Sequence, residues 1–588
     1  MLSTPSPNPT TVSAPTVVDV PARYVRPHAA REIRGIARVG EHLLVLDAPT
    51  GRIALVDPAT DDTRVVNDGW CDLAVGARGL AADEHGAWFT TGAGLHRAGW
   101  VPGASRPGLG GPGLGAPELV RPAGAQTPGG VAAWGDSIYL VEGRSLLVLA
   151  DSPDEAQPVR TVALHGVGRT GIAATEDHLW LTDDVEQTVY CLDRRTLATL
   201  FTVVTPLEGP TAIAAHRRAG AAADELQVAY HEDEPYLKDD PWSQPSWVVR
   251  YRDRALIHPL RVLHDPAARV AWSSGHRISM SYFVEVEPDD DIGALVDGGS
   301  LADVQWRMSL PIDSPRQRLV SVEPIGMPFT VEHEPDLDGH PQPVAVFRIP
   351  QVGAGTRLVL GWRATLEVVG IKHQVRAADL ADAPPLDDER ARRYLVDDED
   401  LDLDSPEVAA ATADAIGEEA NPLLQARRIR THVYDLLEYE MGNADSPIGV
   451  MARGTGSCGE YVSTIMALMR RAGLACRVAG RYKCPYQPWT RGPLYPDFNH
   501  VWVDLYLPGH GWVPVESNPD DVVDGGPYPD RFFMGLPWRH VEVGKDISFE
   551  KVTFDDGDRR RRIGARRLSR NHIRFDVLGE IAPVATGG

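Results

Sequence analysis

The sequence predicts a chain of several domains: an N-terminal β-propeller, a β-sandwich-like middle domain and a C-terminal α+β domain. Three observations predict this class. A three-strand pattern recurs five times in the first third, longer alternating strands follow, and helical periodicity starts only after Ser405. The 588 residues allow about three or four domains, because a single core rarely grows beyond roughly 250 residues.

Composition and charge exclude several classes of protein. The hydrophobic fraction of 43% and the charged fraction of 24% are ordinary for globular proteins. No apolar stretch reaches the roughly 18 residues that a spanning helix needs. The net charge of −24 argues against partners that require a positive field. We therefore expect no nucleic-acid partner and no membrane partner.

Residues 1–22 are predicted to form a disordered tail, because they are rich in Pro, Ser and Thr. They contain neither the basic segment nor the apolar stretch of a secretion signal. The five cysteines of the chain are sparse, odd in number and without a CxxC pair. This pattern argues against a disulfide framework and against a cysteine zinc site. We therefore expect a reducing, cytoplasmic location.

Residues 23–246 carry the repeat. Each copy has a short strand of small apolar residues, a turn, a second apolar strand, another turn and a third strand, on a period of about 40 to 50 residues. The copies start near Gly35, Gly79, Gly130, Gly171 and Ala212. The pattern resembles the blades of a β-propeller of the NHL or YWTD kind. Five copies predict five blades, and the flanking segments "TVVDVPARYVRP" and "SWVVRYRDR" leave a sixth open.

Residues 247–385 are predicted to form a β-sandwich-like domain. Apolar and polar residues alternate in "RISMSYFVEVEP", "DVQWRMSLPI", "PVAVFRIP" and "TRLVLGWRATLEVVG", and turn residues separate these runs. Alternation with a period of two is typical of strands that bury one face. The linker "ADLADAPPLDDERARRY" follows.

Residues 386–588 are predicted to form the α+β domain. Ser405 is expected to cap a helix that begins at Pro406, and Asn421 is expected to cap the next one. Apolar residues in "CGEYVSTIMALMRRAG" follow the spacing of one helix face. Strands are predicted in "ACRVAGRY", "NHVWVDLYLPGHGWVPVES", "HVEVGKDISFEKVTF" and "HIRFDVLGEI". Helices that pack on an antiparallel sheet make an α+β domain.

Three residue types in this domain point to nucleophilic catalysis. Cys458 opens a predicted helix, where the unpaired N–H groups and the helix dipole favour a thiolate. His500 starts an alternating strand and is the candidate general base. Glu516 ends the next strand and is the candidate for orienting the imidazole. Free cysteines are most often buried filler, so the hypothesis for Cys458 depends on this combination.

Three blocks around these residues resemble the core of the transglutaminase-like superfamily. They are "GSCGEYVSTIMALMRRAGLACRVAGRY", "FNHVWVDLYLPGHGWVPVES" and "RHVEVGKDIS". This family has a papain-related fold and includes bacterial transglutaminase-like proteins and peptide N-glycanases. The resemblance covers roughly residues 405–581, and the middle domain is similar to the domain that often precedes this core in bacterial members. A propeller is not part of the usual pattern.

The resemblance implies a catalytic triad of Cys458, His500 and Glu516. The family usually carries Asp in "PVDP" where this chain has Glu516, whose longer side chain leaves the geometry less constrained. Asn518 is the alternative for the same role. We expect Cys476 and Cys484 to be inert and His510 to serve a turn, and His540 is a weaker candidate for the cleft wall.

The sequence therefore predicts a cysteine-dependent enzyme that forms an acyl-enzyme at an amide or thioester carbonyl. Hydrolysis by a peptidase or amidase and transfer to an amine both remain open. We expect a protein, peptide or acyl-thioester substrate, no metal and no organic cofactor, and a propeller that binds a protein partner or the substrate. The alternative is a scaffold protein with a degenerate, non-catalytic transglutaminase-like fold.

Overall fold

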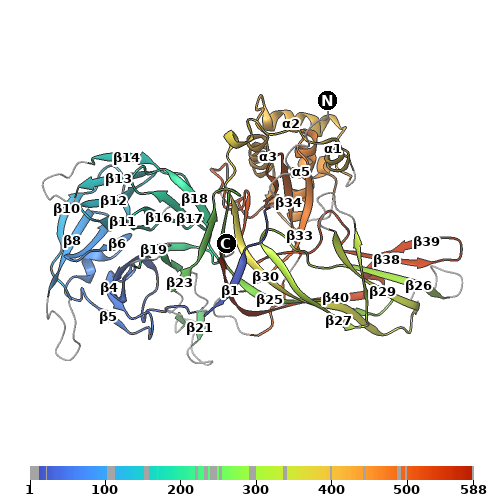
Figure 1. Cartoon of the computed structure of the whole chain (residues 1–588), viewed down its shortest axis with the longest axis horizontal. Helices are drawn as coiled ribbons and strands as arrows, with labels where there is room; N and C mark the ends of the chain where they lie inside the picture. Colours follow the sequence, from blue (N-terminus) through green and yellow to red (C-terminus); the bar gives the residue numbers. More distant parts are fainter. Residues whose placement is uncertain are drawn as a thin grey trace. The chain divides into compact units, whose positions relative to one another are not determined.

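The computed structural model describes residues 12–585 with internal gaps. The gaps are 22, 102–112, 151–157, 169, 219–222, 231–235, 239–247, 251–254, 290–298, 335–340, 398–399, 442–444, 487–491, 497–498 and 523. The chain forms two compact units (Figure 1). We call Pro21–Val262 with Pro529–Arg531 the repeat unit, and Met1–Val20, Leu263–Tyr528 and Phe532–Gly588 the larger unit.

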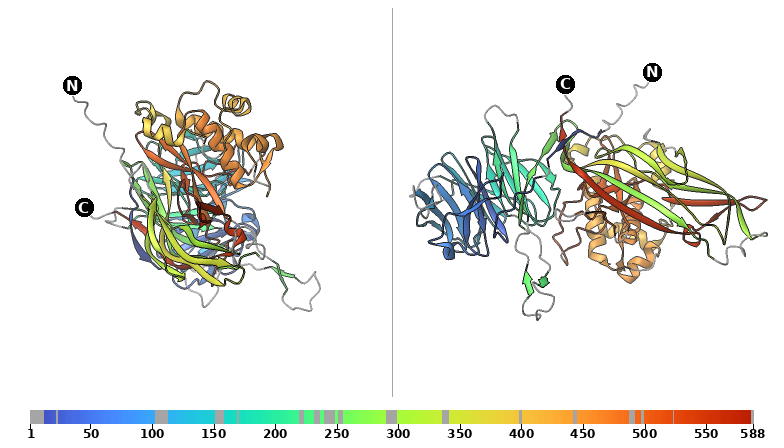
Figure 2. Two further views of the ribbon diagram at one scale, coloured as in Figure 1. Left: turned by 90° about the vertical axis from the view of Figure 1, so that its right-hand side faces the viewer. Right: turned by 90° about the horizontal axis from the view of Figure 1, so that it is seen from below.

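Among the described residues, the repeat unit contains five antiparallel sheets of three or more strands, one for each copy of the repeat (Figure 1 and Figure 2). The first has β2 (Ile33–Val39), β3 (His42–Asp47), β4 (Arg52–Val56) and β5 (Thr63–Val65). The second has β6 (Gly79–Ala82), β7 (Gly86–Thr91), β8 (Gly94–Val101), β9 (Gly113–Leu114) and β10 (Glu118–Pro122). The third has β11 (Pro128–Trp134), β12 (Ser137–Glu142), β13 (Ser145–Ala150) and β14 (Arg160–Ala163). The fourth has β15 (Ile172–Ala174), β16 (His178–Asp183), β17 (Thr188–Asp193) and β18 (Thr199–Val204), and the fifth has β19 (Pro210–His216), β20 (Glu225–Tyr230) and β23 (Leu256–Leu260).

The first strands of these sheets pack against one another in chain order, and β19 also packs against β2. Threonine hydroxyls connect neighbouring sheets. They join Thr90 Oγ1 to Gly129 O (2.6 Å), Thr170 Oγ1 to Pro210 O (3.0 Å) and Thr211 Oγ1 to Ile33 O (2.6 Å). The last of these bonds links the fifth sheet to the first, so the contacts run through all five sheets and return to the start.

The recurring glycine of the repeat is explained by the close approach of these strands. A Cβ on Gly79 would lie 2.6 Å from the carbonyl oxygen of Gly129, and one on Gly171 would lie 2.7 Å from Cα of Ala212. Any side chain at these positions would push neighbouring sheets apart. A short ribbon of β21 (Tyr236–Lys238) and β22 (Val248–Arg250) and a 3₁₀ helix, η1 (Cys71–Ala74), complete the described elements of this unit.

In the larger unit, two antiparallel sheets share an apolar core. The first contains, in spatial order, β1 (Thr16–Val20), β40 (Ser569–Val584), β25 (Val270–Val286), β30 (Leu358–His373) and β27 (Gln317–Gly326), with β24 (Val262–Asp265) and β36 (Gly535–Leu536) at its margins. The second contains β28 (Thr330–Glu334), β29 (Gln342–Gly353), β26 (Ser300–Ser309), β38 (Glu550–Asp555) and β39 (Arg560–Ile563). Trp306 and Trp362 are fully buried in this core. The alternation of apolar and polar residues in the sequence therefore indicates which face of each long strand is buried in this core.

Three predicted boundaries are wrong. Residues 16–20, placed in a disordered tail, form β1 and pair with β40, while residues 1–11 lie outside the described residues. β23 was expected in the middle domain but pairs with β20 of the repeat unit. β38 and β40 were assigned to the α+β domain but pair with β26 and β25. Alternation predicts a strand, whereas its partner can lie hundreds of residues away.

The α+β region places helices against a four-stranded antiparallel sheet. The sheet has, in spatial order, β35 (Gly511–Val515), β34 (His500–Leu507), β33 (Cys476–Lys483) and β37 (His540–Glu542). The helices are α1 (Asp388–Tyr394), α2 (Pro406–Ile416), α3 (Pro422–Leu436), α4 (Pro447–Arg453) and α5 (Cys458–Arg471). β31 (Glu438–Tyr439) pairs in parallel with β32 (Thr455–Gly456), and the 3₁₀ helices η4 (Ala377–Leu380) and η5 (Ala565–Arg567) complete the list. Ile465 and Met469 of α5 share a core with Val503 and Leu505 of β34.

The predicted helix caps are confirmed. The side chain of Ser405 accepts a hydrogen bond from the backbone N–H of Val408, and that of Asn421 accepts from Leu423 and Leu424. Each cap satisfies donors that the first turn of a helix leaves unpaired. Within the described parts of the chain, no helix is both long and apolar enough to cross a membrane.

A buried ion pair fixes the segment that follows β35. Arg430 Nη1 of α3 lies 2.9 Å from Asp520 Oδ2, and these side chains are 1% and 0% exposed. The same carboxylate oxygen accepts from the backbone N–H of Phe532 at 3.2 Å. The guanidinium also lies over the rings of Tyr434 and Phe533.

Replacing Asp520 with Ala is expected to lower the free energy of unfolding by about 3–5 kcal/mol, because the Arg430 guanidinium stays buried without its counter-charge. Urea unfolding followed by tryptophan fluorescence measures the change. Asp524→Ala is the matched control, since Asp524 is exposed. Equal unfolding curves for the two variants would show that the pair contributes nothing.

Candidate active site

The segment "GTGSCGE" folds into a sharp turn that delivers Cys458 to the start of α5. Gly454 ends α4 with a φ of 76°, a left-handed conformation that glycine adopts without strain. A Cβ on Gly456 would lie 2.7 Å from Cβ of Glu460. The backbone N–H of Ser457 donates to Glu460 Oε2 at 2.8 Å, in a capping box that fixes the first turn. Cys458 is therefore the first residue of a rigidly started helix.

The thiol of Cys458 is nearly buried, with 7% of the residue exposed. Its Sγ lies 3.9 Å from the carbonyl oxygen of Asn499, the residue before β34. The thiol also hydrogen bonds with the imidazole of His500. The structure thus joins the start of α5 to the start of β34, two elements that are separated by 42 positions of sequence.

The second ring nitrogen of His500 contacts Glu516, the third residue of the predicted triad. His500 Nε2 lies 2.5 Å from Glu516 Oε1, and both side chains are buried. Burial opposes protonation of His500, but the charge of Glu516 and the hydrogen bonds to Cys458 and Glu516 raise its pKa above the ordinary 6.5. Because Nε2 is engaged by Glu516, Nδ1 is the ring nitrogen available to the thiol.

Glu516 has more partners than the sequence predicted. Its Oε1 also lies 2.7 Å from His540 Nε2 and 3.1 Å from Lys483 Nζ, and its Oε2 accepts from the backbone N–H of Ser517 at 2.5 Å. Burial alone would raise the pKa of Glu516. The charges of His500 and Lys483 and the histidine hydrogen bonds instead hold it well below the ordinary value. Glu516 is therefore a buried carboxylate with a full set of donors.

His540 is held in its neutral form. Burial and the nearby charge of Lys483 lower its pKa well below the ordinary value, against the opposing effect of Glu516. A neutral imidazole that donates from Nε2 carries no proton on Nδ1. Within the described part of the chain, that Nδ1 has no hydrogen-bond partner. The Glu516 contact therefore accounts for the orientation of this ring.

The ligand atoms of His500, Glu516 and His540 lie within 4.8 Å of one another, a grouping that could hold a metal ion. Two features indicate that hydrogen bonds, rather than a metal ion, connect these three side chains. Both imidazoles reach the same carboxylate oxygen at hydrogen-bond distance, and the ammonium of Lys483 already neutralises it. A dication would have to displace this charge pair.

The remaining predicted residues lie apart from this cluster. Asn518 Oδ1 accepts from Ser517 Oγ at 2.9 Å, while the imidazole of His500 is engaged by Glu516. His510 lies 3.0 Å from Nδ1 of His373, and burial lowers its pKa to about 4. Cys476 and Cys484 are buried, and burial raises the pKa of Cys484 to about 12. All five cysteines are free thiols.

Sequence reasoning missed Lys483 and undervalued His540. The two residues are cross-strand neighbours in the β33–β37 ladder, which places both beside Glu516. The alternation of "RHVEV" predicts a strand but not the strand beside it. A signal was present in the order of the blocks, since "RHVEV" follows the Glu516 block and its strand completes the same sheet.

Comparison with known proteins agrees with this geometry. Residues 410–517 match the Transglutaminase-like superfamily, so the stretch from α2 to the residue after Glu516 is a transglutaminase-like domain. No curated protein matched the chain.

Solved structures were also compared. A candidate cysteine protease from Cytophaga hutchinsonii is 13% identical with a TM-score of 0.37, over 53% of this chain and 93% of that one. A glutaminyl cyclase from Myxococcus xanthus is 11% identical with a TM-score of 0.29, over 42% and 97%. The PQQ-bound aldose sugar dehydrogenase from Streptomyces coelicolor is 13% identical with a TM-score of 0.26, over 43% and 99%. At these scores the alignments carry no argument about function.

Proposed function

Because residues 410–517 form a transglutaminase-like domain, we propose that the chain is a cysteine-dependent enzyme that attacks an amide or thioester carbonyl. One observation carries the proposal. A thiol at a helix start contacts a histidine whose other ring nitrogen is bonded to a buried carboxylate. Nucleophile, base and orienting group are arranged in this order in enzymes that form acyl intermediates.

In the proposed reaction, His500 Nδ1 takes the proton of Cys458 and Sγ bonds to the substrate carbonyl carbon. The carbonyl oxygen becomes an oxyanion near the N–H groups of the first turn of α5, which the helix leaves unpaired. The intermediate collapses as the C–N or C–S bond breaks, and His500 returns its proton to the leaving group. Water or an amine then attacks the thioester and restores the thiol.

Glu516 and His540 are proposed to act through His500. Glu516 holds the imidazole in one tautomer and stabilises its cation. His540 positions Glu516, since it donates to the oxygen that His500 uses. The dense set of donors around Glu516 compensates for its greater length relative to the usual Asp, because these donors hold the longer side chain in one place.

Covalent capture tests the proposal. The full chain is incubated with a small acyl thioester, and the intact protein and its peptides are analysed by mass spectrometry. We expect one acyl group on Cys458 in the wild type and none in Cys458→Ala. Subsequent turnover in water, with or without an added amine, distinguishes hydrolysis from transfer. Unmodified Cys458 under all conditions would support the alternative, a scaffold protein without catalysis.

Replacing His540 with Phe is expected to lower kcat about tenfold or more, because a hydrogen bond to a charged group is lost. Glu516 then protonates at higher pH, so the acidic limb of the pH profile shifts upward. His540→Gln keeps an N–H donor and should recover most of the activity. A purely structural role would lower the stability of both variants and leave the acidic limb in place.

We also propose that the five sheets of the repeat unit are the blades of a propeller. The packing of consecutive first strands and the bond from Thr211 to Ile33 support this arrangement. Repeated surfaces of this kind commonly supply recognition, which fits a protein or peptide substrate. The cytoplasmic location stays a prediction, with which the five free thiols are consistent.

A further inference from the structure

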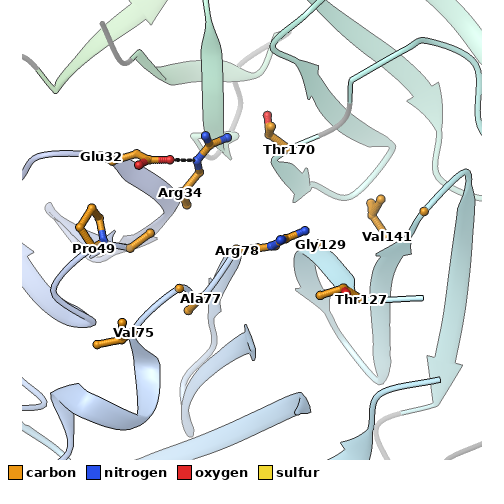
Figure 3. Close-up of a pocket in the computed structure, with 13 residues that line it drawn as sticks. Glu32, Arg34, Pro49, Val75, Ala77, Arg78, Thr127, Gly129, Val141 and Thr170 are labelled. Carbon is orange, nitrogen blue, oxygen red and sulfur yellow. Dashed lines mark hydrogen bonds and ion pairs between the residues drawn. The ribbon is translucent and has the colours of Figure 1, made fainter. Parts of the chain in front are cut away.

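The repeat unit contains a cavity of about 550 Å³, a volume within the range of small-molecule sites (Figure 3). Its side chains come from separate sheets. The polar ones are Glu32, Arg34, Arg78, Thr127 and Thr170. This chemistry differs from that of the cysteine site.

The cavity is built by equivalent positions of the repeat. Arg34, Arg78, Gly129 and Thr170 each precede the glycine that begins a copy, and all four line the cavity. The cavity therefore lies where the first strands of four sheets begin. Two of these four positions carry a guanidinium, although the chain as a whole has a net charge of −24.

The two guanidinium groups differ in their partners. Arg34 is held by acidic side chains, with Nε 2.5 Å from Glu32 Oε1 and Nη1 3.3 Å from Asp184 Oδ2. Arg78 is exposed. Its backbone N–H donates to Thr90 O at 3.0 Å, but its guanidinium has no hydrogen bond or ion pair to any residue that the structure describes. In Figure 3 the Arg78 side chain extends across the ring of lining residues toward Gly129, whereas the Arg34 guanidinium lies beside Glu32.

We propose that this cavity binds the carboxylate of a ligand, with Arg78 as its main anchor. A guanidinium presents a planar fork of donors that matches a carboxylate. The hydroxyl of Thr127 adds a neutral donor on another side of the cavity.

The charge of the lining distinguishes a carboxylate from a dianion. Arg34 is paired with the carboxylates of Glu32 and Asp184, so Arg78 carries the one guanidinium charge of the described lining that no paired carboxylate offsets. A monoanion neutralises this charge, whereas a phosphate dianion would also meet repulsion from Glu32. The carboxylate can belong to a peptide chain or to a small organic acid, and the experiment separates these sources.

Binding is measured by isothermal titration calorimetry on the full chain carrying Cys458→Ala, so that turnover at the cysteine site cannot consume the probe. The probes are acetyl-trialanine, its C-terminal amide, N-acetylglycine and inorganic phosphate. We expect the acid form of at least one probe to bind at least about tenfold more tightly than the amide or phosphate, because the amide lacks the charge. Binding of both acids identifies a general carboxylate site, and binding of the peptide acid alone identifies a peptide end.

Arg78→Gln is expected to weaken the acid at least about tenfold, and Arg78→Lys should recover part of the affinity because it keeps the charge but not the fork. Arg195→Gln is the matched control, since Arg195 is an exposed arginine of the repeat unit outside the cavity. Equal affinity for acid and amide, preference for phosphate, no binding of any probe at millimolar concentration, or an unchanged affinity in Arg78→Gln would each overturn the proposal. None of these results bears on catalysis at Cys458.

Discussion

Limiting iodoacetamide near pH 6 is expected to alkylate Cys458 well before the other four cysteines. Cys458 contacts an imidazole that can accept its proton and stands at the start of a helix, where a thiolate is favoured. Burial raises the pKa of Cys71, Cys191 and Cys484, which keeps them as thiols. Cys476 is fully buried. Peptide mapping at partial modification measures the order, and we expect at least about a hundredfold preference, since the attacking species is the thiolate.

The His500→Ala variant is the control for this prediction. It should lose most of the preference, because the helix dipole alone contributes only about 0.3–1 kcal/mol at a terminus. Cys458→Ala should lose both the label and all turnover. Among the other cysteines, Cys71 is the strongest competitor for the reagent, because it is only partly buried. If Cys71 or Cys484 reacts before Cys458 in the native protein, Cys458 is not the nucleophile.

Glu516→Gln is expected to lower kcat about 10²- to 10⁴-fold, by analogy with the loss of the orienting carboxylate in serine proteases. Here the amide would face two imidazole donors and an ammonium with a single carbonyl oxygen. Glu516→Asp keeps the charge and should be milder. Equal turnover in wild type and Glu516→Gln would remove Glu516 from the mechanism.

The pH profile gives Glu516→Gln a second readout. Glu516 raises the pKa of His500, so in the wild type the imidazolium persists as the pH rises past 6.5. Without the carboxylate, this pKa falls toward or below its ordinary value, because the hydrogen bond to Cys458 is then the main effect that still opposes burial. The rate of Cys458 alkylation by a neutral reagent is measured against pH, and the contribution of the thiolate that has no imidazolium partner is subtracted. The pH at which the remaining rate falls on the alkaline side should therefore be lower in Glu516→Gln than in the wild type. Circular dichroism checks that the variant remains folded.

Local sequence predicted those parts of the site that depend on local physics. Helix starts need caps, so Ser405 and Asn421 could be identified without coordinates. The helix that begins at Cys458 was predicted from the spacing of the apolar residues that follow it, whereas the capping box of Ser457 and Glu460 was found only in the structure. The proximity of Cys458, His500 and Glu516 followed from the resemblance to a family, since no local pattern encodes a contact across 42 residues.

Strand partners were not predictable in this way. β1 and β40 pair across more than 540 positions of sequence, and nothing in "TVVDV" indicates which strand it pairs with. His540 was undervalued for the same reason, because its role depends on β37 lying beside β33. A buried histidine is usually a packing residue, and only its 2.7 Å contact with Glu516 argues otherwise.

The pairing of β1 with β40 has a consequence for biosynthesis. It makes the repeat unit an insertion, since the larger unit begins before it and resumes after it. On the ribosome, the inserted sheets can fold as soon as they emerge, whereas the host sheet waits for β40, which is made long after the repeat unit. The strand of His540 rests on that host, because Arg316 binds Glu542 of β37 at 3.0 Å in a buried ion pair. The cysteine site should therefore mature only after β40 has emerged, so that nascent chains carry the repeat unit before they carry a reactive thiol.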